Sequence, residues 1–248
     1  MIDAVRFEAV RNQIVGRERQ RQGIGTLSEK TVHVILKHYY AANPDTHEIP
    51  IEGYVADVYE DGRILEIQTR NFNKLRNKLE RFLPLYPVTV IYPIPAQKWL
   101  VWIDEETGEF SPKHKSPKRG TLYDVFPELY KIQNYLTHPN FNLRIVLLDM
   151  EELRLLNGWS KNRKRGSSRY DRIPLRIAAE YEFTQPADYM QLLPITLPER
   201  FTTKDYAKEA HTSLGMAQTA LRILYQLGLV QRIGKKGQLI LYEVKETE

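Results

Sequence analysis

The sequence feature that most constrains the fold is a β-hairpin pattern near residue 60. Two stretches rich in β-branched and aromatic residues, 54–59 and 63–69, flank the turn Glu60-Asp61-Gly62. Gly62 stands where a tight hairpin needs a positive φ, which glycine adopts without steric cost. The pattern predicts two neighbouring antiparallel strands that any fold of this chain must include.

On either side of this hairpin, segments whose apolar residues have helical spacing alternate with segments typical of strands. Residues 72–83 carry apolar side chains at helical spacing, and the prolines at 84 and 87 end that segment. The apolar runs that follow are typical of buried strands. The order predicts an α/β fold with a mixed sheet flanked by helices. The expected elements are helices at 3–21, between Gly25 and Asn43, at 72–83 and 122–136, and strands at 47–52, 54–59, 63–69, 88–94, 99–103 and 143–149.

Length and composition favour a globular protein of two domains. The chain has 248 residues, of which 42% are hydrophobic, enough for two compact cores. The absence of Cys argues against disulfides and thiolate metal sites and favours a reducing cytoplasm. There is no apolar run of about 18 residues and no apolar core near the amino terminus, which predicts no membrane span and no signal peptide. The expected division is a first domain at 1–156, a basic linker at 157–174 and a second domain at 175–248.

Basic residues are clustered along the chain. Residues 161–172 contain six basic side chains and one acid, and the net charge of the chain is +5. Such clusters are typical of surfaces that meet phosphate backbones, although solvated loops give the same pattern. Trp159 beside this cluster is a candidate for stacking on a nucleic-acid base. The basic residues predicted to contact DNA here are Lys161, Arg163, Lys164, Arg165 and Arg169.

The carboxyl-terminal third resembles winged helix-turn-helix domains. Residues 203–242 show a capped short helix, a turn, a second helix and a two-stranded wing around Gly234 and Gly237. In that fold the second helix enters the major groove and the wing lies on the backbone. The alternative is that this module mediates protein interaction or dimerisation. The resemblance implies DNA contacts by Ser213, Gln218, Thr219 and Arg222 in the helix and by Lys235 and Lys236 in the wing.

Three polar side chains of the hairpin point to metal chemistry. Glu66 and Gln68 lie two positions apart on one predicted strand, so they share a face while Ile67 points to the other. Asp57 lies on the neighbouring strand, within reach of that face. Carboxylate oxygens bind hard cations, which polarise a phosphoryl oxygen and help to generate hydroxide from water. Taken alone, an acid pair on a hairpin is most often a surface feature.

Residues 23–103 resemble the PD-(D/E)XK nuclease superfamily, whose core is an α-β-β-β-α-β unit. The resemblance implies that Asp57 is the motif acid on the second core strand and that Glu66 and Gln68 are the pair on the third. Glu29 in the preceding helix is then a further catalytic residue and metal ligand. Asp57, Glu66 and Glu29 would hold Mg²⁺, for which Mn²⁺ can substitute. The helix after the third strand is expected to present the basic residues Lys74, Arg76, Lys78 and Arg81.

Two positions depart from the family pattern. Ala56 replaces the usual proline, and Gln68 replaces the usual lysine. Glutamine can hydrogen-bond the attacking water but carries no positive charge. Lys74 is a candidate substitute for that charge. His33 lies four residues after Glu29 and is interpreted as a packed or solvent-facing histidine rather than a ligand.

The resulting functional prediction is a Mg²⁺-dependent DNA endonuclease. The winged helix and the basic loop would hold double-stranded DNA, and a homodimer is compatible with the resemblance. One alternative is a non-catalytic DNA-binding regulator on a degenerate nuclease fold, and another is an RNA- or protein-interaction module. The chain contains no Gly-rich phosphate loop, no HExxH, no G-x-S-x-G and no Cys nucleophile, which argues against other common chemistries.

Overall fold

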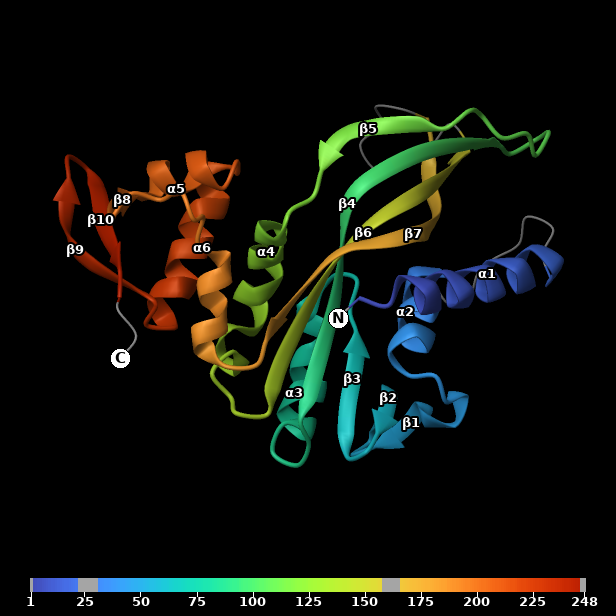
Figure 1. Ribbon diagram of the computed structural model, residues 1–248, viewed down its shortest axis with the longest axis horizontal. Helices are drawn as coiled ribbons and strands as arrows, with labels where there is room; N and C mark the ends of the chain where they lie inside the picture. The colour runs from blue at the N-terminus through green and yellow to red at the C-terminus, as the bar shows by residue number, and fades with distance from the viewer. Residues whose placement is uncertain (1, 22–30, 158–165, 246–248) are drawn as a thin grey trace.

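A computed structural model describes residues 2–21, 31–157 and 166–245, without the side chains of 17–21 (Figure 1). Several residues singled out in the sequence therefore lie outside the described residues. These are Glu29, Trp159, Lys161, Arg163, Lys164 and Arg165.

A seven-stranded mixed sheet forms the centre of the molecule (Figure 1). Its strands are β1 (His47–Ile51), β2 (Tyr54–Glu60), β3 (Arg63–Ile67), β4 (Val88–Asp104), β5 (His114–Arg119), β6 (Phe141–Leu156) and β7 (Ser168–Phe183). They run in the order β1-β2-β3-β4-β6-β7, and β5 pairs with β4 beside this path. β3 is parallel to β4 and β4 is parallel to β6, whereas the other pairs are antiparallel.

The predicted hairpin is confirmed as β2 and β3. Glu60 pairs with Arg63, which leaves Asp61 and Gly62 as a two-residue turn. Both turn residues have positive φ, 50° and 74°. This is the backbone that matches the twist of the flanking strands, and Asp-Gly is a preferred sequence for it.

β4 differs from the sequence prediction of two strands at 88–94 and 99–103. It is one long strand that pairs with β6 from Val88 to Asp104, with a register shift between Pro95 and Gln97. A proline cannot donate to the ladder and is tolerated at a bulge. The polar Pro-Ala-Gln-Lys interruption is thus a bulge inside a continuous strand rather than a loop.

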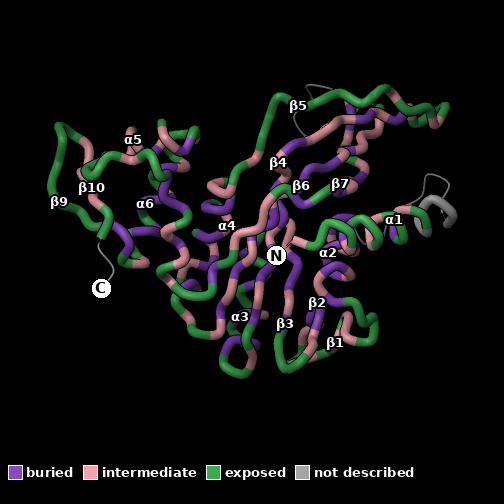
Figure 2. The backbone as a smooth tube through the Cα atoms, in the orientation of Figure 1, coloured by how far each residue is buried: buried purple, intermediate pink, exposed green. Residues whose placement is uncertain are grey.

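Helices cover both faces of the sheet, and each face has its own apolar core. Helices α1 (Ala4–Arg21) and α2 (Thr31–Tyr40) pack on one face, and α3 (Arg76–Phe82) and α4 (Phe126–Leu129) pack on the other. Strand alternation divides the central side chains: Val90 lies in the core beneath α3, and its neighbour Ile91 lies in the core beneath α2. Figure 2 shows buried residues along the strands between these layers. The coarse prediction of a large mixed sheet flanked by helices is therefore confirmed.

The predicted basic linker does not separate two units in the way the sequence indicates. Residues 168–183 form β7, which pairs with β6 between Ser168 and Phe183. Its polar and basic composition reflects a strand with exposed positions, since β7 closes one edge of the sheet. The residues assigned to 168–174 of the linker and to 175–183 of the second domain thus belong to the large sheet.

A small helical and β unit follows β7. It contains β8 (Arg200–Thr202), α5 (Thr203–Glu209), α6 (Leu214–Gln226), β9 (Val230–Lys236) and β10 (Leu239–Val244). Thr202 and Asp205 form a capping box that starts α5, and the Ser213 side chain caps α6. The order of two helices and a hairpin matches the sequence prediction. α6 packs against α4, and buried residues of both helices share one apolar core.

Leu79 on α3 provides a test of the core beneath that helix. Its side chain is completely buried, whereas Leu85, six residues later, is 57% exposed. We expect Leu79→Ala to lower the free energy of unfolding by about 2–5 kcal/mol, because it leaves a cavity in the core. Leu85→Ala makes the same chemical change and should cost less than about 0.5 kcal/mol. Urea unfolding of both variants measures the difference, and equal costs would contradict the assigned packing of α3.

Candidate functional site

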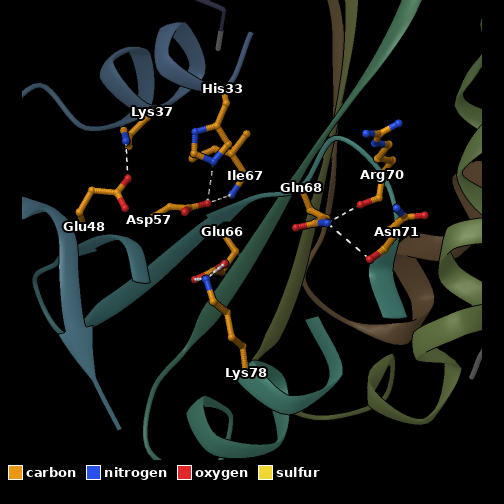
Figure 3. Close-up of polar contacts among 10 residues, drawn as sticks. All are labelled: His33, Lys37, Glu48, Asp57, Glu66, Ile67, Gln68, Arg70, Asn71 and Lys78. Carbon is orange, nitrogen blue, oxygen red and sulfur yellow. Dashed lines mark hydrogen bonds and ion pairs between the residues drawn. The ribbon is translucent and has the colours of Figure 1, made fainter. Parts of the chain in front are cut away.

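Two carboxylates face each other across the β2–β3 hairpin. Val58 pairs with Leu65 in the antiparallel register, so the next positions, Asp57 and Glu66, lie opposite one another. Directly opposed like charges destabilise a strand pair unless cations compensate them. Both side chains are largely shielded from solvent, with exposed fractions of 15% for Asp57 and 2% for Glu66. The pair therefore depends on its positively charged neighbours (Figure 3).

Asp57 is held through one of its oxygens. Its Oδ2 accepts a hydrogen bond from the Ile67 backbone N–H at 2.7 Å and lies 3.1 Å from Nε2 of His33 on α2. Burial raises the pKa of the Asp57 carboxyl, but the hydrogen bond and charge of His33 and the Ile67 N–H outweigh it, so the pKa lies below its usual value. Asp57 is thus a carboxylate at neutral pH. Its Oδ1 accepts no hydrogen bond from a described residue.

Glu66 is paired with Lys78 on α3. The Lys78 Nζ lies 2.7 Å from one carboxylate oxygen and 3.0 Å from the other. Burial and the adjacent Asp57 carboxylate raise the pKa of Glu66 to about 7, although Lys78 acts in the opposite direction. A positive charge placed near both acids would lower that pKa. The environment of Glu66 therefore favours a further cation.

Gln68 lies just beyond the end of β3, beside the acid pair. Its amide nitrogen donates to the backbone carbonyls of Arg70 and Asn71. Asn71 has a left-handed backbone with φ of 59°, which turns the chain sharply after the strand. Gln68 thus holds the turn that leads into α3, the helix that carries Lys78 (Figure 3).

These groups line a single open depression of about 360 Å³. It contains three of the four residues predicted to be catalytic, namely Asp57, Glu66 and Gln68. The fourth, Glu29, lies outside the described residues. The lining also includes four basic or imidazole side chains: His33, Arg70, Lys74 and Lys78.

Part of a donor set for a hard divalent cation is present among the described residues. Asp57 and Glu66 contribute adjacent carboxylates, and Asp57 Oδ1 is available as a ligand among the described atoms. Two carboxylates alone do not enclose a cation. Within the described ranges, no group of three or more His, Cys, Asp or Glu side chains is arranged to hold a metal ion. Further ligands would have to come from water, substrate or residues outside those ranges.

The sequence interpretation missed the importance of Lys78 and His33. Lys78 was only one of four basic residues expected on the helix after β3, and Lys74 was favoured as the substitute cation. In the structure Lys74 is exposed, whereas Lys78 faces Glu66. His33 was interpreted as packed or solvent-facing, yet it contacts Asp57. The positions of Lys74 and Lys78, one helical turn apart, left no local signal that only one of them faces the acids.

The predicted DNA contacts in the small unit have different surroundings. Gln218 on α6 and Lys235 and Lys236 on β9 are exposed. The Thr219 hydroxyl donates to the Gly215 carbonyl within α6. The Arg222 guanidinium lies over the Tyr130 ring, 5.0 Å from its centroid, on the side of α6 that approaches α4.

A second group of charged residues lies where β4, β6 and β7 run together. The side chain of Glu152 on β6 is 3% exposed. Its carboxylate forms ion pairs with Lys98 at 3.2 Å, Arg154 at 2.9 Å and Arg172 at 2.9 Å. Burial raises the pKa of Glu152, but Arg172 and Lys98 dominate and lower it to about 2. Arg169 is the member of the predicted 161–169 basic cluster that lies within the described residues, and it is on β7 beside this group.

The described helices include none that is both long and apolar enough to cross a membrane.

The fold and the site define a mixed-sheet α/β protein with a compensated acid pair at the end of a hairpin. Residues 30–184, more than half of the chain, match the family described as Domain of unknown function (DUF8091), and the protein belongs to that family. The match ends one residue after β7, so it spans the large sheet. A Treponema pallidum (strain Nichols) protein with the name "Uncharacterized protein" is 30% identical over 223 residues, which cover 88% of this chain and 86% of that one. No solved structure matches the chain.

Glu152 provides a pH test of the charged group. Its pKa of about 2 in the folded protein lies below the unfolded value of 4.5, so its ion pairs stabilise the fold above pH 4.5 and lose this effect as pH falls towards 2. We expect Glu152→Gln to cost about 1–2 kcal/mol at pH 7, after allowance for solvent screening, and progressively less below pH 4.5. Urea unfolding at pH 7, 4 and 3 measures this trend. Glu151→Gln is the control, because its partner Lys113 is 58% exposed, and a cost for Glu152→Gln that is independent of pH would contradict the assignment.

Proposed function

We propose that the protein is a Mg²⁺-dependent DNA endonuclease of the PD-(D/E)XK type, with Mn²⁺ as an alternative metal. The observation that carries the proposal is the opposed Asp57–Glu66 pair, which lies in one depression with Gln68 and Lys78. Two adjacent carboxylates in a largely basic depression suit a cation bound together with a phosphate. A homodimer and a cytoplasmic location are also part of this proposal.

Each described residue of the site has a role that follows from its position. Asp57 and Glu66 would hold the metal, which supplies Lewis-acid stabilisation of the phosphoryl oxygen and a more acidic water. Lys78 would supply the positive charge that Gln68 lacks, because its ammonium already lies at the acid pair. Gln68 would keep the turn after β3 in place and present its amide oxygen towards the depression. His33 fixes the orientation of Asp57.

The small unit would hold the duplex as a winged helix. The exposed side chains of Gln218 on α6 and of Lys235 and Lys236 on the β9–β10 hairpin support this role. Thr219 and Arg222 belong to the same proposed surface, but Arg222 would have to leave the Tyr130 ring to reach DNA. Arg169 would contact the DNA backbone. Four basic residues that precede it in the sequence, outside the described residues, would do the same: Lys161, Arg163, Lys164 and Arg165.

Asp57→Asn tests the metal site directly. We expect it to lower the rate of plasmid nicking in Mg²⁺ by about 10³-fold or more, since a metal-bound phosphoryl oxygen contributes several kcal/mol to catalysis. Asp61→Asn makes the same change four residues away in the exposed turn and should leave the rate unchanged. Supercoiled-plasmid relaxation with matched protein concentrations measures both. Equal activity of Asp57→Asn and the wild type would refute the proposed site.

Substitutions of Lys78 and Lys74 test which of these two lysines supplies the positive charge in catalysis. We expect Lys78→Gln to lower the nicking rate by about 10²-fold, because it removes the charge beside Glu66, whereas Lys74→Gln should change it little. Adding Gln68→Lys to Lys78→Gln should restore part of the lost rate by returning a lysine to the family position. A larger loss in Lys74→Gln than in Lys78→Gln would reverse the assignment.

A second candidate function is DNA binding without cleavage. The observation that favours it is that Lys78 already neutralises Glu66 and that the Gln68 amide nitrogen is engaged by the turn. This function predicts salt-dependent binding to duplex DNA, no nicking with Mg²⁺ or Mn²⁺, and unchanged affinity in Glu66→Gln. Electrophoretic mobility shift and nicking assays on the same wild-type preparation distinguish it from the endonuclease.

A further inference from the structure

A second depression adjoins the acid site. It has a volume of about 210 Å³ and shares Thr69 and Arg70 with the first depression. Its apolar lining comes from α2, β4 and β6, through Val32, Pro93 and Met150. Its polar lining consists of three arginines, Arg70, Arg169 and Arg172, together with Thr69, Tyr170 and Asp171. The first depression thus continues past the end of β3 into a second, more enclosed space.

Three arginines of this depression offer donors that no described residue uses. The side chains of Arg70 and Arg169 make no hydrogen bond or ion pair with any residue in the described ranges. Arg172 donates through its Nε to Glu152, and its two terminal nitrogens donate to no described residue. In Figure 3 the Arg70 side chain extends from the turn away from Glu66 and Lys78. The three arginines line one space and come from two separate parts of the chain.

The electrostatic surroundings of Arg169 disfavour its positive charge. Burial and the charge of Arg172 lower the pKa of Arg169, with smaller effects in the same direction from Arg70 and Arg154. Glu152 opposes this, but its carboxylate is shared among Lys98, Arg154 and Arg172. Asp171 is a second acid of this depression, and its carboxylate accepts a hydrogen bond from the Thr31 hydroxyl. Among the described residues, the basic groups still outnumber these two acids. Bringing like charges together is costly unless a ligand of opposite charge binds between them.

We propose that Arg70, Arg169 and Arg172 form a subsite that binds a phosphate group of the substrate nucleic acid. The guanidinium fork matches phosphate oxygens and donates two parallel hydrogen bonds. Because Arg70 lines both depressions, a strand whose scissile phosphate lies at Asp57 and Glu66 has another phosphate within reach of this subsite. This inference rests on the proposed function for the identity of the polynucleotide.

Glu152 has a positioning role in this subsite. The Glu152 carboxylate accepts a hydrogen bond from the Nε of Arg172, so the terminal nitrogens of Arg172 are not used by this contact. It also accepts a hydrogen bond from Arg154, which lies on the same strand as Glu152. A buried acid that clamps one edge of a guanidinium reduces the conformational freedom that Arg172 must lose on binding an anion. The ion pairs of Glu152 thus organise the basic depression as well as stabilising the fold.

Binding of a fluorescent DNA duplex in EDTA tests the subsite without cleavage. We expect Arg169→Gln to raise the Kd about tenfold or more at low salt, since charge-assisted hydrogen bonds to a phosphate are lost. The slope of log K against log salt should fall in magnitude by about 1. Arg169→Lys should restore the charge and the slope but only part of the affinity. Arg63→Gln is the control, because it removes the same charge from the exposed start of β3 and should leave the Kd unchanged.

A comparison of duplexes with different ends shows whether the subsite binds an internal or a terminal phosphate. Equal affinity for duplexes with 5′-phosphate and 5′-hydroxyl ends indicates an internal phosphate. Tighter binding of the 5′-phosphate duplex that disappears in Arg169→Gln indicates a terminal one. Either result supports the subsite. A Kd and salt slope for Arg169→Gln equal to those of the wild type, with its thermal unfolding unchanged, would overturn it.

Failure of the subsite and failure of the proposed function give different results. If Arg169 contributes to DNA binding but the wild type never nicks DNA in Mg²⁺ or Mn²⁺, the subsite stands and the endonuclease fails. If the wild type nicks DNA and Arg169→Gln binds as well as Arg63→Gln, the endonuclease stands and the subsite fails. A titration of the arginine Nε–H resonances with inorganic phosphate adds an independent readout, in which the Arg169 and Arg172 signals should shift and the Arg63 signal should not.

Discussion

Parallel pairing of β4 with β6 is the constraint on which the rest of the structure depends. The two strands pair from Val88 with Phe141 to Asp104 with Leu156, through the centre of the sheet. Parallel strands are stable when helices bury both faces, which is why α2 and α3 lie on opposite sides. β3 then adds in parallel to β4, and its hairpin partner β2 brings Asp57 opposite Glu66.

The acid pair is compensated from two different layers. His33 comes from α2 and Lys78 comes from α3, and each of these two side chains contacts a different carboxylate. Because Glu66 is almost completely buried, its negative charge must be stabilised by Lys78 and by any further positive charge in the depression. In the second charged group one buried carboxylate, Glu152, pairs with three basic side chains, and Arg70 and Arg169 line the depression that also contains Arg172. The depression with the acid pair thus adjoins a depression lined by three arginines.

The parts of the fold that could be predicted are those coded by local sequence. The hairpin, the amphipathic segment after it and the order of the small unit were all expressed in turn residues, capping residues and apolar spacing. Two elements could not be predicted in this way. β4 looked like two strands because Pro95 and Gln97 interrupt its apolar pattern, and only pairing with β6 shows a bulge. The first part of β7, residues 168–174, looked like a linker because an edge strand keeps one set of side chains in solvent.

The sequence by itself determined that Asp57 and Glu66 would meet, because a two-residue Asp-Gly turn sets the hairpin register and alternation then puts both acids on one face. Only the tertiary structure decided which cations face them. Lys74 and Lys78 have the same chemistry and lie on the same short segment, and the packing of α3 against the sheet directs Lys78 to Glu66. Arg70 and Arg169 are about a hundred positions apart in the chain, and they line one depression because β6 and β7 fold back across the sheet. Local steric rules act over a few residues, whereas the charge around a site is summed over every element that the fold brings to it.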